Sequence, residues 1–236
     1  MSNKCAVILA GGKGTRLRPY TIAMPKPLVP VGDAPIMEIV IRQLRKNGFD
    51  RIILTVNHQA ELIKAYFGDG SKWGLKIEYS LEDKPLGTMG PLRLIKGLPD
   101  SFLVMNGDIL TDLNYGDFLE KHIKSDSIYT ISGYKRTHKV DYGVLHINED
   151  SKLCGFEEKP ELYYSVSMGV YAVSKEILEY IPYNEYFGFD NLMHKLINSG
   201  KSVTVDVFDG YWLDIGRPED YAKATEDFEE KKGCFL

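Results

Sequence analysis

The sequence has few cysteines, no strongly basic segment and no long apolar run. Its three cysteines, Cys5, Cys154 and Cys234, are widely spaced and form no CxxC pair, which is typical of reduced thiols in a cytoplasmic protein. The apolar segment CAVILA near the N-terminus is far shorter than the ~20 residues that a membrane span needs. Glycines follow it rather than a small-residue cleavage site. We therefore expect a cytoplasmic protein with no membrane partner.

The charge balance is mildly acidic. The 236 residues include 29 Lys and Arg against 33 Asp and Glu, a formal net charge of −4. Nucleic-acid-binding proteins usually carry a basic domain or stripe, so we expect no nucleic-acid partner. A phosphorylated small molecule is still compatible, since it needs only a local group of cations.

No Pro/Ser-rich linker and no fixed-period repeat interrupts the chain, and the hydrophobic and charged fractions of 44% and 26% are ordinary for a globular protein. In the first half, short apolar runs alternate with helical patterns, which indicates βαβ units. Strands are expected at 5–10, 51–56, 76–79, 102–105 and 128–133, and helices at 35–47, 60–67, 90–96 and 118–124. The second half mixes shorter strands at 143–147, 166–173 and 203–208 with helices at 175–180, 191–198 and 218–230.

This pattern predicts an α/β fold with a doubly wound, mostly parallel, Rossmann-like sheet and a mixed second half. We expect one domain over 1–236, with a nucleotide-binding half over about 1–135 and a ligand-binding half over about 136–236. The oligomeric state is not readable from the sequence, and a homo-oligomer stays open. The aromatic stretch at 180–189 suits either a partner surface or a lid over the ligand.

A glycine-rich loop follows the first strand directly. The segment LAGGKGTRLR runs from Leu9 to Arg18, and glycines let several backbone N–H groups approach a phosphate. Lys13, Arg16 and Arg18 add positive charge that suits a polyphosphate. It is neither a Walker A loop, since Gly14 follows Lys13, nor a GxGxxG fingerprint. A tight turn with solvated cations is the simpler alternative.

Three further side chains are candidates for phosphate or metal binding. Prolines on both sides of Lys26, in PKPLVP, hold that lysine on a stiff segment, although it could equally be solvated. Asp108 of the NGD segment follows a buried strand, where a carboxylate suits Mg²⁺ that bridges substrate phosphates; a β-turn role is the alternative. Asp214 of WLDIG is, on its own, as well explained as a turn or capping residue.

These segments together resemble the sugar-1-phosphate nucleotidyltransferases, also called nucleoside-diphosphate-sugar pyrophosphorylases. The resemblance covers nearly the whole chain and is greatest to mannose-1-phosphate and heptose-1-phosphate guanylyltransferase-like enzymes. It implies a nucleotidyltransferase fold of the GT-A-like kind, without the left-handed β-helix that many relatives append. The motifs that carry it are LAGGKGTRLRP, PKPLVPV, KPLGT (84–88), NGD (106–108), FEEKP (156–160) and WLDIGRPEDY (212–221).

The resemblance also implies a role for individual residues. Catalysis would rest on Arg16, Lys26 and Asp108, and Mg²⁺ would be bound by Asp108 and Asp214. The residues implied to bind the nucleotide are Leu9, Gly11, Gly12, Gly14, Thr15, Arg16, Glu82, Pro85, Gly87, Thr88 and Asp108. Those implied to bind the sugar phosphate are Gly143, Glu158, Lys159, Gly169 and Asp190.

The expected reaction joins a nucleoside triphosphate and a sugar-1-phosphate into a nucleotide sugar and pyrophosphate, by Mg²⁺-assisted in-line displacement. A carboxylate at Glu82 could accept two hydrogen bonds from guanine, whereas uracil and thymine suit an amide better, so GTP is favoured. Alternatives are the same chemistry with UTP, CTP or dTTP on another sugar phosphate, a solvated Glu82, and a non-catalytic subunit that binds a nucleotide sugar. A Rossmann oxidoreductase is disfavoured by the missing fingerprint.

Overall fold

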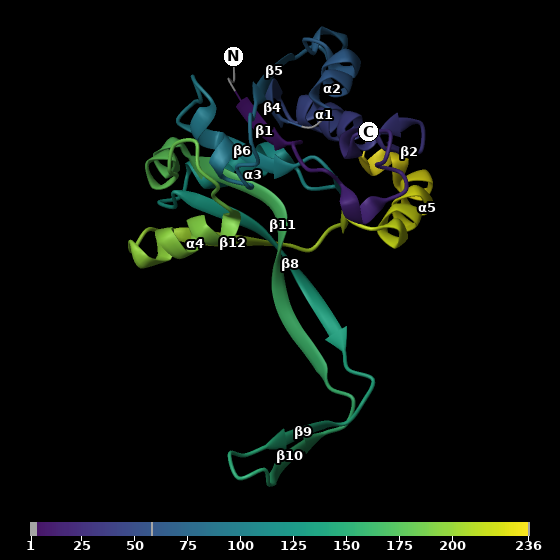
Figure 1. Cartoon of the computed structure of the whole chain (residues 1–236), viewed down its shortest axis with the longest axis vertical. Helices are drawn as coiled ribbons and strands as arrows, with labels where there is room; N and C mark the ends of the chain where they lie inside the picture. Colours follow the sequence, from purple (N-terminus) through teal and green to yellow (C-terminus); the bar gives the residue numbers. More distant parts are fainter. Residues whose placement is uncertain (1–3, 58, 236) are drawn as a thin grey trace.

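A seven-stranded sheet forms the centre of the computed structural model, which describes residues 4–57 and 59–235 (Figure 1). Its strand order is β12-β8-β11-β6-β1-β4-β5. The strands are β1 (Lys4–Leu9), β4 (Phe49–Val56), β5 (Lys76–Leu81), β6 (Ser101–Asn106), β8 (Tyr129–Lys139), β11 (Glu161–Ser174) and β12 (Val203–Phe208). Strands β6, β1, β4 and β5 are parallel, β12 is parallel to β8, and β11 is antiparallel to both its neighbours. The predicted α/β class with a mostly parallel sheet is confirmed.

Short ribbons and helices complete the structure. The remaining strands are β2 (Pro30–Val31), β3 (Ala34–Pro35), β7 (Ile109–Thr111), β9 (Val144–Ile147), β10 (Leu153–Glu157) and β13 (Trp212–Asp214). The α-helices are α1 (Ile36–Lys46), α2 (Ala60–Phe67), α3 (Tyr115–Ile123), α4 (Phe189–Asn198) and α5 (Pro218–Phe235). Within the described ranges, none of these helices is long and apolar enough to cross a bilayer.

Both faces of the sheet are covered, as the continuous apolar strands predict. Alternate residues of β1 point to opposite faces: Ala6 and Ile8 pack into one buried cluster with α1, α2 and α3, whereas Cys5 and Val7 pack into another with α4. A third cluster joins α5 to β2, β3, β7 and β13. This third cluster brings the C-terminal part of the chain to the same side as the glycine loop.

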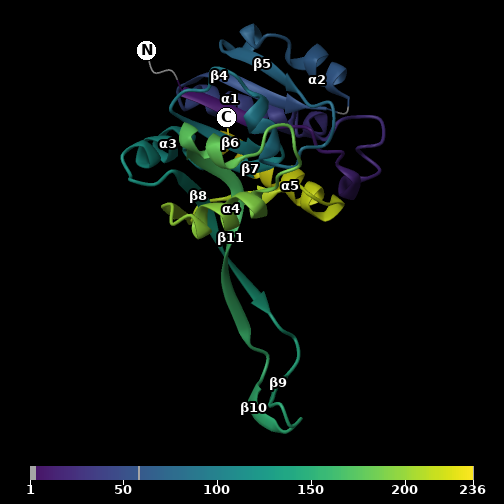
Figure 2. The ribbon, with the colours of Figure 1, turned by 60° about the vertical axis from the view of Figure 1, so that its left-hand side comes forward.

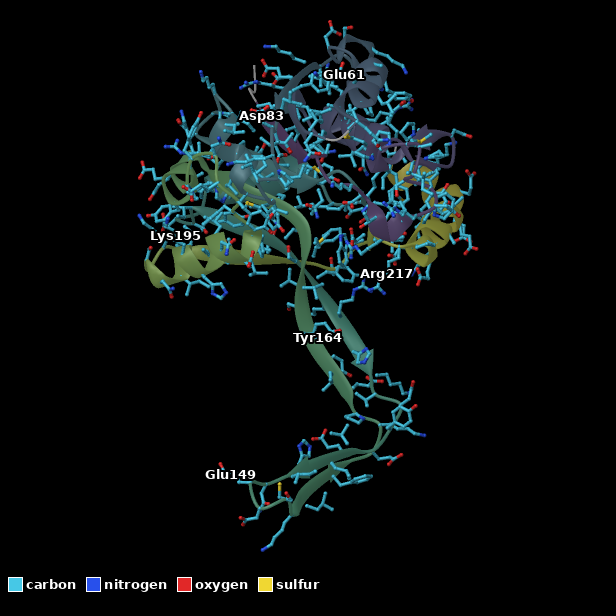
Figure 3. All side chains as sticks on the ribbon, viewed as in Figure 1. Glu61, Asp83, Glu149, Tyr164, Lys195 and Arg217 are labelled. Atoms are coloured by element: carbon cyan, nitrogen blue, oxygen red, sulfur yellow. The ribbon has the colours of Figure 1, made fainter. Side chains whose placement is uncertain are left out.

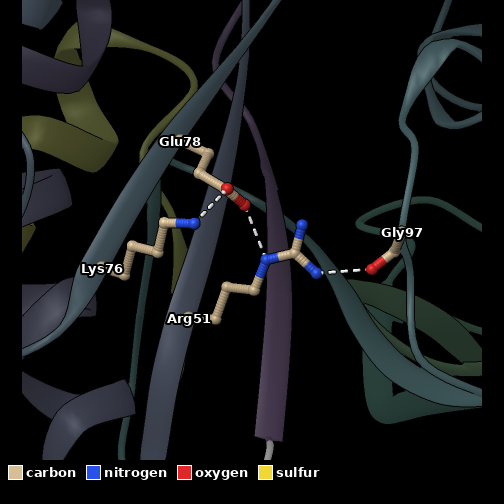
Figure 4. A network of polar contacts seen from close by, with 4 residues as sticks. All are labelled: Arg51, Lys76, Glu78 and Gly97. Atoms are coloured by element: carbon tan, nitrogen blue, oxygen red, sulfur yellow. Dashed lines mark hydrogen bonds and ion pairs between the residues drawn. The ribbon is translucent and has the colours of Figure 1, made fainter.

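A polar network fastens the edge of the parallel half of the sheet (Figure 4). Arg51 of β4 donates from Nε to Glu78 of β5 at 2.6 Å, and Lys76 donates to the other oxygen of that carboxylate at 2.6 Å. The second end of the Arg51 guanidinium donates to the carbonyl oxygen of Gly97 at 2.6 Å. The network therefore ties two strands to the loop that precedes β6.

The second half differs from expectation in one large feature. The strands expected at 128–133 and 166–173 extend much further, and β8 and β11 continue as a two-stranded ribbon away from the sheet, with β9 and β10 at its far end (Figure 2). Isolated apolar runs give no signal for such a continuation, because the outer residues are largely polar. The expected helices at 90–96 and 175–180 are 3₁₀ helices, at Gly90–Leu94 and Lys175–Tyr180.

Candidate functional site

A cavity of about 520 Å³ lies where β1, β4 and β6 end. The C-terminal ends of parallel strands are where open α/β sheets bind ligands, and this volume lies within the usual range for ligand pockets. Each of the eleven residues implied to bind the nucleotide lines this cavity, together with Lys26. Stretches that are distant in the sequence therefore converge there: the glycine loop, the PKPL segment, the KPLGT loop and the NGD turn.

The glycine loop is shaped by Gly14. Its φ of 60° lies in the left-handed region, which a side chain rarely tolerates. Its carbonyl oxygen accepts hydrogen bonds from the Leu17 N–H at 3.0 Å and from the Thr21 hydroxyl at 2.7 Å. A Cβ atom at Gly14 would lie 3.1 Å from the Cβ atom of Lys26. The absence of a side chain thus allows the glycine loop and the lysine segment to lie against each other.

Lys26 and Asp108 form an ion pair at the edge of this cavity. Lys26 Nζ donates to Asp108 Oδ2, and both side chains are mostly buried, with 13% and 18% of their surface exposed. The other oxygen, Asp108 Oδ1, is buried without a hydrogen-bond partner among the described residues. A buried oxygen without a partner is costly, so this atom is available to a ligand or an ion.

Asp214 lies beside Asp108, because β13 pairs with β7 and the Ile215 N–H donates to the Asp108 carbonyl oxygen at 3.0 Å. Burial and then the neighbouring Asp108 carboxylate raise the pKa of Asp214, while Lys26 and Arg16 act in the opposite direction. A divalent cation bound between two carboxylates relieves their mutual repulsion, so this pair is suited to bind one.

The donor set fits Mg²⁺, which commonly uses one or two carboxylates plus substrate phosphates and water. Among residues 4–57 and 59–235, no group of three or more His, Cys, Asp or Glu side chains is placed to hold a metal alone. The unpartnered Asp108 Oδ1 and its neighbour Asp214 therefore offer a partial coordination sphere that phosphate oxygens would complete.

Glu82 also lines the cavity and is only 7% exposed. Its Oε2 accepts the Leu86 N–H at 3.2 Å. Burial raises the pKa of this carboxyl, and the Leu86 hydrogen bond opposes the rise. Its Oε1 lies 2.9 Å from the position that a Cβ atom at Gly11 would take, so Gly11 leaves room above the carboxylate. The solvated alternative for Glu82 does not match this burial.

The five residues implied to bind the sugar phosphate fall into two groups. Gly169 lies against the cavity residue Asn106, since a Cβ atom at Gly169 would be 2.6 Å from Asn106 Nδ2. Asp190 follows Phe189, whose N–H donates to the cavity residue Thr88 at 2.8 Å. The remaining three, Gly143, Glu158 and Lys159, lie beside β9 and β10 at the end of the ribbon and do not line the cavity.

Sequence reasoning did not single out several residues that line the cavity. Thr55 and Asn57 stand at the end of β4, the strand next to β1; the position of that strand end is a signal that could have identified them. Tyr186 also lines the cavity although 70% of it is exposed. The stretch 180–189, for which a partner surface or a lid is expected, thus contributes Tyr186 to the cavity lining.

The fold and the cavity define an α/β protein whose glycine loop, cations and paired carboxylates suit a phosphorylated ligand. A family model described as Nucleotidyl transferase matches residues 5–231. The chain belongs to the nucleotidyl transferase family.

Relatives of known activity differ in base and in length. The chain is 36% identical over 239 residues to a UTP–glucose-1-phosphate uridylyltransferase from Synechocystis. The aligned region covers 93% of this chain and 62% of that protein. The chain is 33% identical over 231 residues to a D-glycero-alpha-D-manno-heptose 1-phosphate guanylyltransferase from Aneurinibacillus thermoaerophilus. This alignment covers 95% of this chain and 98% of that protein. A solved structure of HddC from Yersinia pseudotuberculosis complexed with GMP-PN has a TM-score of 0.70 and 32% identity, covering 95% of this chain and 99% of that one.

Proposed function

We propose that this protein transfers a nucleotidyl group from a nucleoside triphosphate, with GTP favoured, to a sugar-1-phosphate. The products are a nucleotide sugar and pyrophosphate. The observation that carries the proposal is the convergence of the glycine loop, the Lys26–Asp108 pair and Asp214 around one cavity. The guanylyltransferase relatives that match over nearly their whole length support the choice of GTP.

The reaction needs close approach of two anions. An oxygen of the sugar phosphate attacks the α-phosphorus, and the bond from that phosphorus to the pyrophosphate oxygen breaks. A phosphate monoester is largely ionised at neutral pH, since its second pKa is about 6, so no general base is required. Unit charges of like sign at ~4 Å repel by about 4 kcal/mol at an effective dielectric constant of ~20. Positioning and charge neutralisation are therefore the main catalytic requirements.

Different residues would neutralise the phosphate charge and bind the metal. Arg16 and Lys26 supply positive charge beside the glycine loop, whose backbone N–H groups can donate to phosphate oxygens. Asp108 and Asp214 would hold Mg²⁺, which would supply Lewis-acid stabilisation of phosphate charge when bound. Lys26 also holds the Asp108 carboxylate in place through their ion pair.

Glu82 supports the preference for GTP. A buried carboxylate in the KPLGT side of the cavity can accept hydrogen bonds from the N1–H and N2–H₂ groups of guanine. Uracil and thymine keep one donor, N3–H, where guanine has N1–H, but they present the acceptor O2 where guanine has N2–H₂, so one carboxylate oxygen would lose its donor. The Synechocystis relative acts with UTP by its name, and for this reason UTP is the alternative that the test must include.

The test is a matrix of GTP, UTP, CTP, dTTP and ATP against a panel of sugar-1-phosphates, with released pyrophosphate as the readout. Activity with GTP and one or more sugars is the expected result, and Lys26→Ala abolishes most of it. Lys96→Ala, at an exposed position away from the cavity, is the matched control. Absence of turnover with every pair, together with tight binding of a nucleotide sugar, would identify a binding subunit instead. The reduced, widely spaced cysteines support a cytoplasmic location for this reaction.

A further inference from the structure

The ribbon that leaves the sheet is a distinct structural element. We define the arm as residues 134–166, which comprise the outer parts of β8 and β11 and the β9–β10 hairpin. Its two long strands stay paired without interruption from Tyr134↔Val166 to Lys139↔Glu161. This paired segment is about 20 Å long at the usual rise per residue. Figures 1 and 2 show the arm projecting from the body in both views, and Figure 3 labels Tyr164 along it and Glu149 at its far end.

The far end of the arm has one apolar face. Pairing of Leu145 with Phe156 and of Ile147 with Leu153 places these four side chains on one side of the β9–β10 hairpin. They are 56–63% exposed. The opposite side carries Val144 and the His146–Glu157 pair at 2.8 Å.

The β8–β11 part of the arm, which we call the shaft, also carries apolar side chains on one of its faces. Leu162, Tyr164 and Val166 alternate along β11 with Glu161, Tyr163 and Ser165, so they share a face of the ribbon. Leu162 and Tyr164 are 50% and 48% exposed. An isolated two-stranded ribbon is marginally stable at best in water, and contiguous exposed apolar surface marks an interaction site. The arm therefore has the composition of a segment that packs against another surface.

The same segment carries part of the proposed active site. Gly143 lies against Phe156, since a Cβ atom at Gly143 would be 2.7 Å from the Phe156 ring and 3.3 Å from Glu158 Oε2. Lys159 follows Glu158 directly, at the point where the chain turns back into β11. These three residues are implied to bind the sugar phosphate, yet the cavity of their own chain is lined without them. The nucleotide side is assembled in one chain, and the sugar-phosphate side is incomplete.

We infer that the arm of one copy packs against a second copy and completes the sugar-phosphate side of that copy's cavity. This inference rests on the proposed function. The β8–β11 ladder is regular along the arm and shifts register between Ser167 and Tyr171, where the arm leaves the sheet. In both views the arm projects away from the body (Figures 1 and 2), and none of its residues lines the cavity of its own chain. A second copy offers an identical cavity that lacks the same residues, and a two-fold exchange of arms satisfies both copies at once. The apolar face of the hairpin and the Tyr164 face of the shaft would be buried in this dimer.

Complementation between two inactive variants tests the exchange. Asp108→Asn damages the cavity and leaves the arm intact, whereas Lys159→Ala damages the arm and leaves the cavity intact. Each is expected to be inactive alone at low sugar-phosphate concentration. Co-expressed with different tags and purified as a mixed dimer, they contain one wild-type site of two, so about half of wild-type activity returns. If the wild-type protein is active but the mixed dimer of the two variants recovers no activity, the inference is overturned. Full activity of Lys159→Ala alone also overturns it.

A second experiment does not depend on turnover, so it separates failure of the arm exchange from failure of the proposed reaction. Variants with one exposed cysteine, Lys159→Cys on the arm and Tyr186→Cys on the cavity rim, are made with Cys154 and Cys234 replaced by serine, while Cys5 stays buried. When the two are mixed and treated with a flexible bis-maleimide, a covalent dimer is expected. A cross-link within one chain of the doubly substituted protein, with none between chains, overturns the inference.

Solution mass gives a third readout. Light scattering should report a dimer, twice the 26.7 kDa chain mass. Leu145→Glu with Phe156→Glu should shift it to a monomer with at least tenfold weaker self-association. Ile123→Glu on α3 is the matched control, since Ile123 is also 56% exposed but lies off the arm, and it should stay dimeric. A wild-type monomer at micromolar concentration, or equal effects of the arm and control variants, overturns the inference.

Discussion

Replacing Asp108 with asparagine tests the proposed charge arrangement most directly. Asn keeps the size of the side chain and one acceptor oxygen but loses the negative charge. Lys26 will take that oxygen, because its ammonium group needs an acceptor, and the new NH₂ group then occupies the position of Asp108 Oδ1. An NH₂ group cannot bind a cation. The variant therefore removes the ligand atom while preserving the Lys26 contact.

The expected loss in kcat is at least ~100-fold, which is about 2.7 kcal/mol of transition-state stabilisation. This is less than the repulsion of about 4 kcal/mol between two unit phosphate charges at ~4 Å and an effective dielectric constant of ~20, since Arg16 and Lys26 still supply positive charge. Folding stability should not fall in parallel. Asp108 raises the pKa of Asp214, so removing the Asp108 charge relieves a repulsion in the metal-free protein.

The assay is pyrophosphate release under saturating substrates over a Mg²⁺ titration, with thermal unfolding of the metal-free protein measured alongside. Asp112→Asn is the matched control: Asp112 lies just after β7 and accepts the Tyr211 N–H at 2.8 Å, and it does not line the cavity. It should keep near-normal kcat. Turnover of the Asp108 variant close to wild type at saturating Mg²⁺ would refute the ligand assignment, and a large fall in its melting temperature would show that the loss is structural.

Three other predictions concern the sugar side, the KPLGT loop and the pH dependence of stability. Lys159→Ala should raise the KM for the sugar phosphate far more than the KM for the nucleotide; equal effects in steady-state kinetics would count against its placement. Gly87→Ala should destabilise the fold by ~1–3 kcal/mol, because Gly87 has a φ of 77° and a Cβ atom would lie 2.8 Å from the Phe187 carbonyl oxygen; an unchanged melting temperature would contradict this. Burial lowers the pKa of His122, so the unfolded chain binds that proton first and stability should fall as pH drops below ~6.5. His122→Asn should flatten the melting temperature between pH 7.5 and 5.5, and an unchanged slope would show that another group is responsible.

Much of the nucleotide side of the cavity could be predicted from residues 4–108. Buried parallel strands appear as short apolar runs, and the segments after them must meet at one edge of the sheet. The glycine loop after β1 and the NGD turn after β6 are examples. Thr55 and Asn57 were missed because their segment has no distinctive composition, although the same topological argument places the end of β4 at this edge.

The arm could not be predicted in this way. Apolar runs at 143–147 and 166–173 indicate strands, but alternation alone does not say whether a strand's apolar face meets its own core or another molecule. The position of Glu158 and Lys159 depends on the direction in which the paired β8 and β11 leave the sheet. That direction is set by strand register and twist summed over many residues, which a short sequence segment does not reveal.

By itself, the sequence determined the alternation of strands and helices, the phosphate-binding character of the loop after β1 and the chemical types gathered around it, because these follow from local periodicity and residue chemistry. Only the tertiary structure decided that Asp214 lies beside Asp108, that Glu82 is buried, and that the FEEKP segment stands apart from the cavity. These placements arise from strand pairing between distant parts of the chain, which no local pattern encodes.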